Sequence, residues 1–233
     1  RRMNYAIIAA GEGSRLAQEG VALPKPLVKL NGVAMIQRLI DIFAKNDAES
    51  ISIIVNEEMT QVQEYVKNIK LNVPLNIVVK STPSSMHSFF ELRSFLRKGK
   101  FCLTTVDTIF REDDFTHYIQ AFIADDEVDG MMAVTDFIDD EKPLYVSVDD
   151  GMKITGFLDK SSSCKYISGG IYGLSSKAID TLEACLESGQ SRMRNFQRQL
   201  ITDGLFIKAY PLSKIVDVDH AGDIEKAEAF LRE

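Results

Sequence analysis

A glycine-rich turn near the start of the chain contains the residues whose types and spacing point most directly to chemistry. Residues 9–16 follow a short apolar segment and include Ala10, Gly11, Gly13, Ser14 and Arg15. Because glycine has no side chain to block the backbone, the amide groups of such a turn can converge on a phosphate. The sequence therefore predicts an anion-binding loop, to which the Arg15 guanidinium adds a positive charge.

This turn differs from the two commonest phosphate-binding motifs. In the dinucleotide-binding fingerprint a third glycine would stand where this chain has Leu16, and in a P-loop a lysine would follow the glycines. Nicotinamide-dependent enzymes and P-loop ATPases are therefore disfavoured. The histidines, cysteines and serines also show no spacing typical of a metal cage or a nucleophilic triad.

Lys25 is the second candidate catalytic residue. It stands between Pro24 and Pro26, shortly after the glycine-rich turn. Because proline restricts the backbone, the two prolines fix the direction of the Lys25 ammonium group. A lysine held in this way is better suited to neutralising phosphate charge than to lying free in solvent.

Three aspartates follow or end strand-like segments. Asp107 follows the apolar run 101–106, and Asp217 and Asp219 alternate near the end of the chain. In open α/β sheets, ligands bind at the carboxyl ends of the parallel strands. In a regular strand Asp217 and Asp219 would share a face, so only a strand that ends or bulges between them separates their directions.

The elements that must position these residues alternate between strands and helices. Apolar strand-like runs at 3–9, 50–55, 75–79 and 101–106 are separated by helical spacing, which predicts a mainly parallel sheet with helices on both faces. After about residue 125 the pattern changes to short strands and acidic or glycine turns. We expect one domain over 1–233, with a nucleotide-binding half over about 1–125 and an acceptor-binding half, richer in antiparallel strands, over about 126–233.

Composition limits the classes of partner. Lysine and arginine number 27 against 34 aspartate and glutamate, a net charge of −7, which disfavours a nucleic-acid-coating protein. The three cysteines are too few and too widely spaced for a disulfide framework, so a reducing cytoplasm is expected. No apolar run is long enough to span a bilayer. We therefore expect a cytoplasmic protein without a nucleic-acid or membrane partner.

The motifs together resemble a known family. The glycine turn with Arg15, the Pro24–Leu27 segment and the Asn31-Gly32 pair before a helix are similar to the signature of the sugar-1-phosphate nucleotidyltransferases, or nucleotide-sugar pyrophosphorylases. That family includes short cytidylyltransferases acting on phosphocholine-like substrates. The resemblance implies a Rossmann-like fold of the GT-A type, with a smaller antiparallel lobe on the substrate side.

The resemblance also implies a Mg²⁺ site. The family holds the ion on an aspartate at a strand end, which corresponds to Asp107, although Val106 stands where the family more often has glycine. The closing element of the family implies Asp219 as the second ligand, with Asp217 as the alternative. Asp223 is expected to cap a final helix starting at residue 224.

Further residues are assigned to substrates by the same resemblance. Lys160 corresponds to the lysine that meets the acceptor phosphate, although Ser161 replaces the usual proline, and Gly170 lies in a strand that floors the acceptor pocket. Ser84 and Ser85 lie where the family recognises the base and ribose. A serine at this point is equally suited to cap a helix.

The implied activity is transfer of a nucleoside monophosphate from a nucleoside triphosphate to a sugar 1-phosphate or related phosphorylated acceptor, with release of pyrophosphate. Arg15 and Lys25 would be the catalytic cations. A phosphate monoester has a second pKa near 6, so no general base is needed. Two alternatives remain open: a GT-A glycosyltransferase that uses Asp217 and Asp219 as its metal motif, and a non-catalytic nucleotide-binding regulator. The base and the acceptor are also left open by the sequence.

Overall fold

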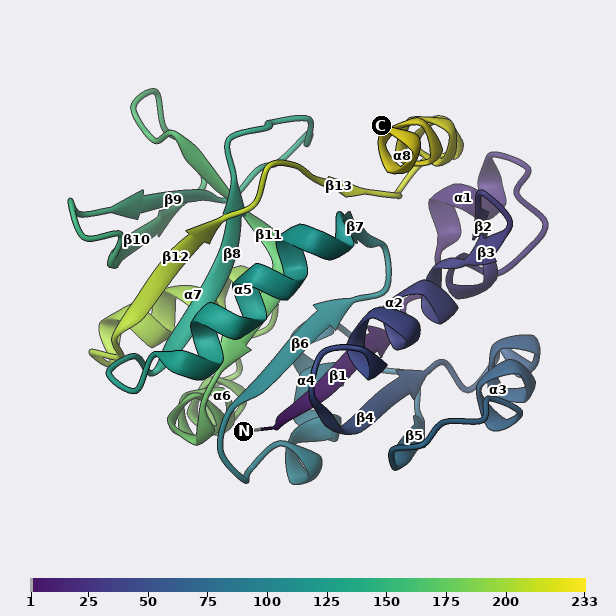
Figure 1. The fold of residues 1–233 in the computed structure, drawn as a ribbon, viewed down its shortest axis with the longest axis horizontal. Helices are drawn as coiled ribbons and strands as arrows, with labels where there is room; N and C mark the ends of the chain where they lie inside the picture. Colours follow the sequence, from purple (N-terminus) through teal and green to yellow (C-terminus); the bar gives the residue numbers. More distant parts are fainter. Residues whose placement is uncertain (1) are drawn as a thin grey trace.

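A computed structural model describes residues 2–233 of the chain (Figure 1). In this range the large sheet consists of β1 (Met3–Ala9), β4 (Ala48–Val55), β5 (Leu75–Val79), β6 (Phe101–Thr105), β8 (Gly130–Thr135), β9 (Tyr145–Val148), β10 (Ile154–Leu158), β11 (Tyr166–Leu174) and β12 (Ile207–Pro211). Two short antiparallel pairs are β2 (Lys29–Leu30) with β3 (Val33–Ala34), and β7 (Thr108–Phe110) with β13 (Ile215–Asp217).

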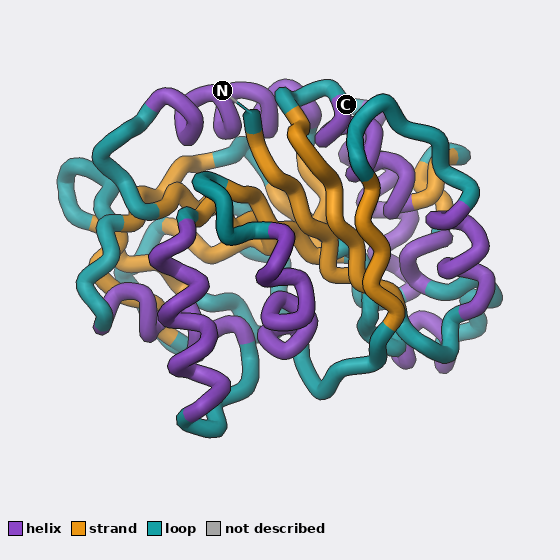
Figure 2. The backbone as a smooth tube through the Cα atoms, turned by 90° about the horizontal axis from the view of Figure 1, so that it is seen from below, coloured by secondary structure: helices purple, strands orange, loops and turns teal. Residues whose placement is uncertain are grey.

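The helices are α1 (Ser14–Gln18), α2 (Met35–Ala44), α3 (Thr60–Lys67), α4 (Ser85–Leu92), α5 (Glu112–Ala124), α6 (Ser176–Glu187), α7 (Met193–Thr202) and α8 (Ala221–Arg232), with 3₁₀ turns η1 (Lys25–Leu27) and η2 (Arg93–Phe95). Figure 2 shows the strands passing between helices on both sides. This is a Rossmann-like arrangement, and it confirms the mixed α/β architecture expected from the sequence.

The sheet has a parallel part and an antiparallel part. Strands β6, β1, β4 and β5 are adjacent and parallel, and β12 is parallel to β8. The long strand β11 runs antiparallel to its neighbours: β8 pairs along one of its edges, and β6 and β9 pair along the other. The β9–β10 hairpin turns at Asp149 and Gly151, as the sequence predicted.

Alternation along each strand divides the core into two layers. Tyr5 and Ile7 of β1 pack in one hydrophobic cluster with α2, α3 and α5, whereas Ala6 and Ile8 pack in the other with α4, α6 and α7. Successive side chains of a strand point to opposite faces, so a strand buried on both faces must be apolar throughout. This explains the continuous apolar run of β1.

A third cluster joins the end of the chain to its beginning. Phe230 and Ala227 of α8 are buried with Leu16 of α1 and Leu30 of β2, and Figure 1 shows α8 beside these segments. Helix α8 begins at Ala221, earlier than expected. Asp223 therefore lies in its first turn, where its carboxylate accepts hydrogen bonds from the backbone amides of Asp219 and His220.

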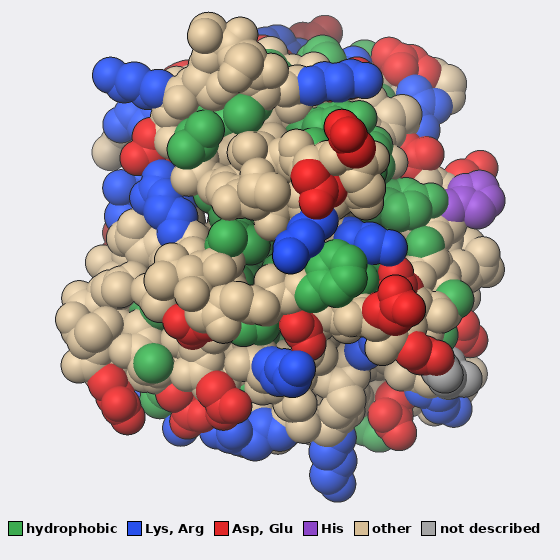
Figure 3. Space-filling model, turned by 90° about the vertical axis from the view of Figure 1, so that its left-hand side faces the viewer, with side chains coloured by type: hydrophobic (Ala, Val, Ile, Leu, Met, Phe, Trp, Pro, Cys, Tyr) green, Lys and Arg blue, Asp and Glu red, His purple; other side chains and the backbone are tan. Residues whose placement is uncertain are grey.

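The surface is mixed in charge. In Figure 3, basic and acidic side chains are interspersed over the face shown, and hydrophobic side chains are scattered. None of the helices within residues 2–233 combines the length and the apolar character needed to cross a membrane.

Close approach between β11, β8 and α5 makes one glycine essential. A Cβ atom at Gly173 would lie 2.5 Å from the Tyr118 hydroxyl oxygen and 2.6 Å from the Met131 carbonyl oxygen. That hydroxyl donates a hydrogen bond to the same carbonyl, so neither atom can move without breaking a buried interaction. A Cβ atom at Gly156 in β10, by contrast, would meet no neighbouring atom within 4 Å.

We expect Gly173→Ala to lower the free energy of unfolding by about 2 kcal/mol or more, because overpacking forces backbone or side-chain shifts. Gly156→Ala is the matched strand control and should be neutral or slightly stabilising. Urea denaturation followed by circular dichroism measures both. Equal stability of the two variants would show that β11 and α5 are less tightly packed than described.

Candidate active site

The candidate site lies where the parallel strands end. Strands β1, β4 and β6 are parallel neighbours, so the segments that follow their carboxyl ends meet at one edge of the sheet. Strand β11 passes the same edge. Ile171 pairs with Thr104, so residues 168 and 169 extend past the end of β6. Pairing of β13 with β7 places Asp217 opposite Thr108.

Lys25 lies between two of the predicted aspartates. Its ammonium nitrogen is 3.0 Å from Asp107 Oδ2 and 3.3 Å from Asp219 Oδ1. The side chains of Lys25 and Asp107 are 17% and 19% exposed. Residues from three distant segments thus converge on one ammonium group.

The backbone around Lys25 explains its position. The Lys25 residue opens η1, in which the Leu27 amide donates to the Pro24 carbonyl at 2.9 Å. Gly13 adopts φ 61°, and a Cβ atom there would lie 3.1 Å from Lys25 Cβ. The glycine-rich loop therefore packs directly against Lys25, and a larger residue at position 13 would be both strained and crowded.

The carboxylates and the lysine alter one another's pKa values. Burial opposes charge on Lys25, but Asp107 and Asp219 outweigh it and raise the Lys25 pKa above its ordinary value, so this ammonium group stays protonated. Burial and the nearby Asp219 raise the pKa of Asp107, despite the opposing effect of Lys25. Desolvation in the cleft, followed by Asp107, Asp219 and Asp140, raises the Asp217 pKa well above its ordinary value.

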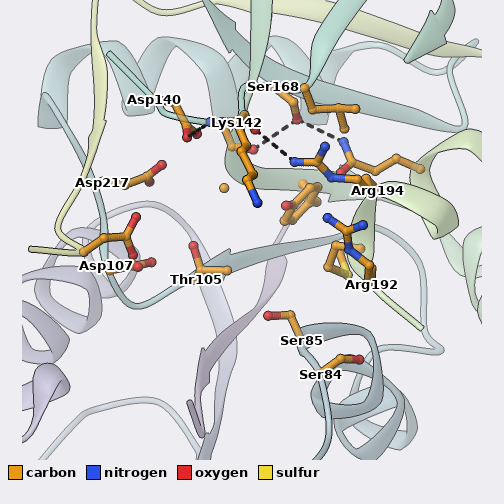
Figure 4. Close-up of a pocket in the computed structure, with 17 residues that line it drawn as sticks. Ser84, Ser85, Thr105, Asp107, Asp140, Lys142, Ser168, Arg192, Arg194 and Asp217 are labelled. Carbon is orange, nitrogen blue, oxygen red and sulfur yellow. Dashed lines mark hydrogen bonds between the residues drawn. The ribbon is translucent and has the colours of Figure 1, made fainter. Parts of the chain in front are cut away.

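The carboxylates of Asp107, Asp217 and Asp219 line a cleft of about 390 Å³, and Lys25 lies behind them, outside the lining. Figure 4 shows Asp107, Asp140 and Asp217 along one side and Arg192 and Arg194 along the other, with Lys142 extending into the space between. Both Asp217 and Asp219 line this cleft, although β13 ends at Asp217. Val218 between them is fully buried, so the chain turns its two acidic side chains to the cleft and its apolar one inward.

The predicted nucleotide-loop residues are not part of the cleft lining, and the loop reaches the site through the contact of Gly13 with Lys25. Ala10 is buried, and its carbonyl accepts a 2.8 Å hydrogen bond from Asn56 Nδ2. Gly11 and Ser14 are exposed, as is Arg15. Among residues 2–233, no side chain forms an ion pair or hydrogen bond with the Arg15 guanidinium, which leaves it free to meet an anion.

Ser84 caps a helix, as one of the two functions considered for it predicts, and the other function stays a prediction. It is the N-cap of α4, where its hydroxyl oxygen accepts a 3.3 Å hydrogen bond from the His87 amide. It also lines the cleft together with Ser85, and Figure 4 shows both at the lower wall.

The cleft lining includes a lysine, but not the one that the sequence predicted for the acceptor phosphate. Lys142 lines the cleft, whereas Lys160 is exposed beyond the end of β10 and is not part of the lining. Asp159, the neighbour of Lys160, lies 2.8 Å from Arg194 Nη1 and 2.6 Å from Arg198 Nη2. Arg194 Nη2 in turn donates to the Lys142 carbonyl at 3.0 Å.

Sequence reasoning missed Lys142, Arg192 and Arg194. Lys142 follows an acidic run, which gave no sign that it faces a ligand. Arg192 has φ 82°, a conformation that costs a non-glycine residue about 1–3 kcal/mol. Such strain is concentrated at functional positions, but it becomes visible only with a backbone in hand.

The glycines and the two departures from the family pattern have structural explanations. Gly170 lines the cleft, and a Cβ atom there would lie 2.4 Å from Thr105 Oγ1. The Val106 side chain is buried in the core, away from the cleft. The Ser161 hydroxyl oxygen accepts hydrogen bonds from the amides of residues 163 and 164, so it forms the turn where the family has proline.

The acidic residues could hold a metal only with help from a ligand. Within residues 2–233, no three histidine, cysteine or acidic side chains are placed closely enough to form a metal site on their own. Asp107 and Asp219 each present one carboxylate oxygen to Lys25 and keep a second oxygen. A pair of carboxylates completed by phosphate oxygens and water suits Mg²⁺, which keeps several waters and rarely uses an all-protein cage.

Comparison with solved structures shows the fold. The chain superposes on the inositol-1-phosphate CTP transferase from T. maritima with a TM-score of 0.81 at 19% identity, covering 100% of this chain and 97% of the other. It superposes on a putative glucose-1-phosphate thymidylyltransferase from Bacillus anthracis with a TM-score of 0.82 at 20% identity, covering 99% and 96%.

The relatives found by sequence are longer proteins than this chain. The bifunctional protein GlmU of Methanococcus maripaludis (strain S2) is 24% identical over 234 residues, which is 97% of this chain and 53% of that protein. The 2-aminoethylphosphonate cytidylyltransferase of Lancefieldella rimae is 26% identical over 115 residues, or 48% and 46%. The chain thus spans about half the length of these relatives. The nucleotidyl transferase family model, however, matches residues 5–230, and the chain belongs to the nucleotidyl transferase family.

Proposed function

We propose that this protein transfers a nucleoside monophosphate from a nucleoside triphosphate to a small phosphorylated acceptor. The observation that carries the proposal is the contact of the Lys25 ammonium group with Asp107 and Asp219, beside a glycine loop and above an acceptor-sized cleft. Family membership supports the same reaction class.

The reaction needs charge neutralisation rather than a protein nucleophile. An oxygen of the acceptor phosphate attacks the α-phosphorus, and the bond from that phosphorus to the β-phosphate oxygen breaks. The electron pair leaves with pyrophosphate. Because the attacking oxygen is already deprotonated at neutral pH, no proton has to be removed. The barrier is lowered by holding anions together and in line.

Two groups of cations would serve the two substrates, one beside the cleft and one in its wall. The amides of the 10–14 loop and the Arg15 guanidinium would bind the triphosphate, and Lys25 would neutralise charge developing at the α-phosphate. Lys142 and Arg192 are the cations best placed for the acceptor phosphate, because both line the cleft without an acidic partner within the described chain. Lys160, assigned to that phosphate from the family resemblance, lies outside the lining.

Asp107 and Asp219 would hold Mg²⁺. The chemistry that the ion would supply is positive charge, which would stabilise the negative charge of the phosphates during transfer. Lys25 would orient both carboxylates and limit their mutual repulsion. Asp217, which lines the same wall, is the alternative ligand.

The decisive experiment crosses CTP, UTP, GTP, ATP and dTTP with sugar 1-phosphates, polyol phosphates and phosphocholine, with and without MgCl₂. Metal-dependent pyrophosphate release that requires both substrates is expected. A glycosyltransferase would consume a nucleotide sugar without releasing pyrophosphate. Nucleotide binding without turnover in every combination would instead identify a non-catalytic regulator.

Removal of the Lys25 ammonium group should lower turnover strongly. We expect Lys25→Ala to reduce kcat by at least about 10²-fold, because a preorganised charge is lost from the reacting phosphate. Lys29→Ala, in the same segment but exposed on β2, is the matched control and should retain normal activity. Steady-state pyrophosphate release and circular dichroism are the measurements. Normal kcat in a folded Lys25→Ala variant would contradict the role of this lysine.

The three aspartates should differ in their effect on metal use. Asp107→Asn and Asp219→Asn should each raise the Mg²⁺ concentration for half-maximal activity by about 10-fold or more, because a ligand and a charge are lost. Asp217→Asn should have a weaker effect. A large shift with Asp217→Asn and a small one with Asp219→Asn would reverse the two assignments, and three unchanged values would remove the two-carboxylate site.

A further inference from the structure

Residues 136–144, which connect β8 to β9, contribute to the cleft without forming a helix or a strand. Asp140 and Lys142 line the cleft, and Figure 4 shows Lys142 extending into it. Glu141, which stands between them, is not part of the lining, and its Oε1 atom lies 3.3 Å from His220 Nε2. A segment without a backbone hydrogen-bond ladder needs other contacts to hold a side chain in one direction. The direction of Lys142 therefore depends on what holds its backbone.

The backbone of Lys142 is held on both sides by side chains. Its amide donates to Asp140 Oδ1 at 2.9 Å, and its carbonyl oxygen accepts from Arg194 Nη2 at 3.0 Å. Pro143 follows directly, and the residue before a proline is disfavoured in the helical conformation. Asp140 belongs to the same segment, whereas Arg194 belongs to α7. The contact with Arg194 therefore sets where Lys142 stands relative to the rest of the cleft.

The guanidinium group of Arg194 is itself fixed by Asp159, the residue that follows β10. Arg194 Nη1 lies 2.8 Å from Asp159 Oδ1, and Arg198 Nη2 lies 2.6 Å from the same oxygen. Hydrogen bonds from Arg194 and then Arg198 lower the pKa of Asp159 below its ordinary value, so this carboxylate is ionised at neutral pH. Arg198 Nε also donates to the Phe157 carbonyl at 3.2 Å. These contacts form a network, which holds its members better than an isolated surface ion pair does.

Arg194 and Lys142 differ in how much of their bonding capacity the protein already uses. One terminal nitrogen of Arg194 bonds to a carboxylate and the other to a carbonyl oxygen, an arrangement that the rigid fork of arginine allows and the single nitrogen of lysine does not. The Lys142 ammonium group has no acidic partner within residues 2–233, and it extends into the cleft. Arg194 is therefore suited to hold a neighbouring segment, and Lys142 is suited to meet an anion.

We propose that Asp159 and Arg194 are positioning residues for the acceptor side of the reaction. Asp159 fixes the Arg194 guanidinium group, Arg194 holds the Lys142 carbonyl, and of these three residues Lys142 meets the acceptor phosphate. This inference rests on the proposed nucleotidyl transfer, and it applies to any phosphorylated acceptor. The acidic member of the pair at positions 159 and 160, rather than its lysine, then serves acceptor binding.

The test is a double-variant comparison in the pyrophosphate-release assay, with the nucleoside triphosphate and acceptor that react fastest in the substrate panel. Arg194→Lys keeps the positive charge but cannot bond to both partners. Lys142→Met removes the ammonium group and keeps a long side chain. Arg198→Met is the matched control, because Arg198 shares α7 and the Asp159 contact but does not line the cleft. Asp159→Asn tests the first step of the network.

Lys142→Met should raise the acceptor KM by about 10-fold or more, because a charge-assisted contact with the phosphate is lost. Arg194→Lys and Asp159→Asn should each raise it by about 5- to 10-fold, because Lys142 is then no longer held in place. Lys142→Met combined with Arg194→Lys should be no worse than Lys142→Met alone, since no ammonium group is left to position. The KM for the nucleoside triphosphate should stay within about twofold throughout, and Arg198→Met should keep the wild-type acceptor KM.

Three results would overturn the inference and leave the proposed function standing. Additive losses in the double variant would show that Arg194 binds the acceptor itself. A wild-type acceptor KM in Arg194→Lys would show that only its charge matters, and an equal rise of both KM values would show a general structural role. Circular dichroism checks folding, and should Arg194→Lys not fold, Asp159→Asn takes its place in the double variant. Absence of pyrophosphate release from the wild type with every substrate pair would refute the proposed function, and this inference with it.

Discussion

The contact of Lys25 with Asp107 and Asp219 is the interaction on which the rest of the site depends. Two carboxylates this close repel each other, and the partly buried ammonium group between them offsets that repulsion. Removing one member of such a group leaves an uncompensated charge, so the three residues form one electrostatic unit. Each comes from a different part of the chain. Correct placement of all three therefore requires the η1 turn, the end of β6 and the β7–β13 pairing to be formed together.

That requirement explains the topology around the site. Asp107 needs only the parallel strand order, because β6 lies next to β1 and both end at the same edge. Asp219 needs the chain to return after β12 and pair with β7, and the Val218 amide donates to the Asp107 carbonyl at 3.1 Å. Packing of α8 against α1 and β2 then fixes this last segment to the glycine-rich loop. Asp219, near the end of the chain, thus completes a site to which Lys25, near its beginning, also belongs.

Local sequence patterns predicted the strands and the turn that are determined by interactions between residues close in sequence. The apolar runs of β1 and β6 and the glycine hairpin at Gly151 are set by burial and backbone freedom, and they were found where expected. Strands β7 and β13 have three residues each and exist because they pair with each other, so their own sequences give little signal. Tertiary contacts also determine that Lys142, and not Lys160, lines the cleft. This follows from Arg194, which is held by Asp159 and itself holds the Lys142 carbonyl.

The cleft is divided into an acidic wall that suits a cation bound to phosphates and a basic wall that suits the anion of the acceptor. This division raises the free energy of the protein without substrates. Charges of like sign lie close together on each wall, and Arg192 is held in a strained backbone conformation. The strain is located at Arg192, the N-cap residue of α7, which lines the cleft. A relaxed backbone at this position would redirect the guanidinium group away from the cleft. Because strain of this kind is retained mainly at functional positions, the conformation of Arg192 supports a binding role for its guanidinium group in the cleft.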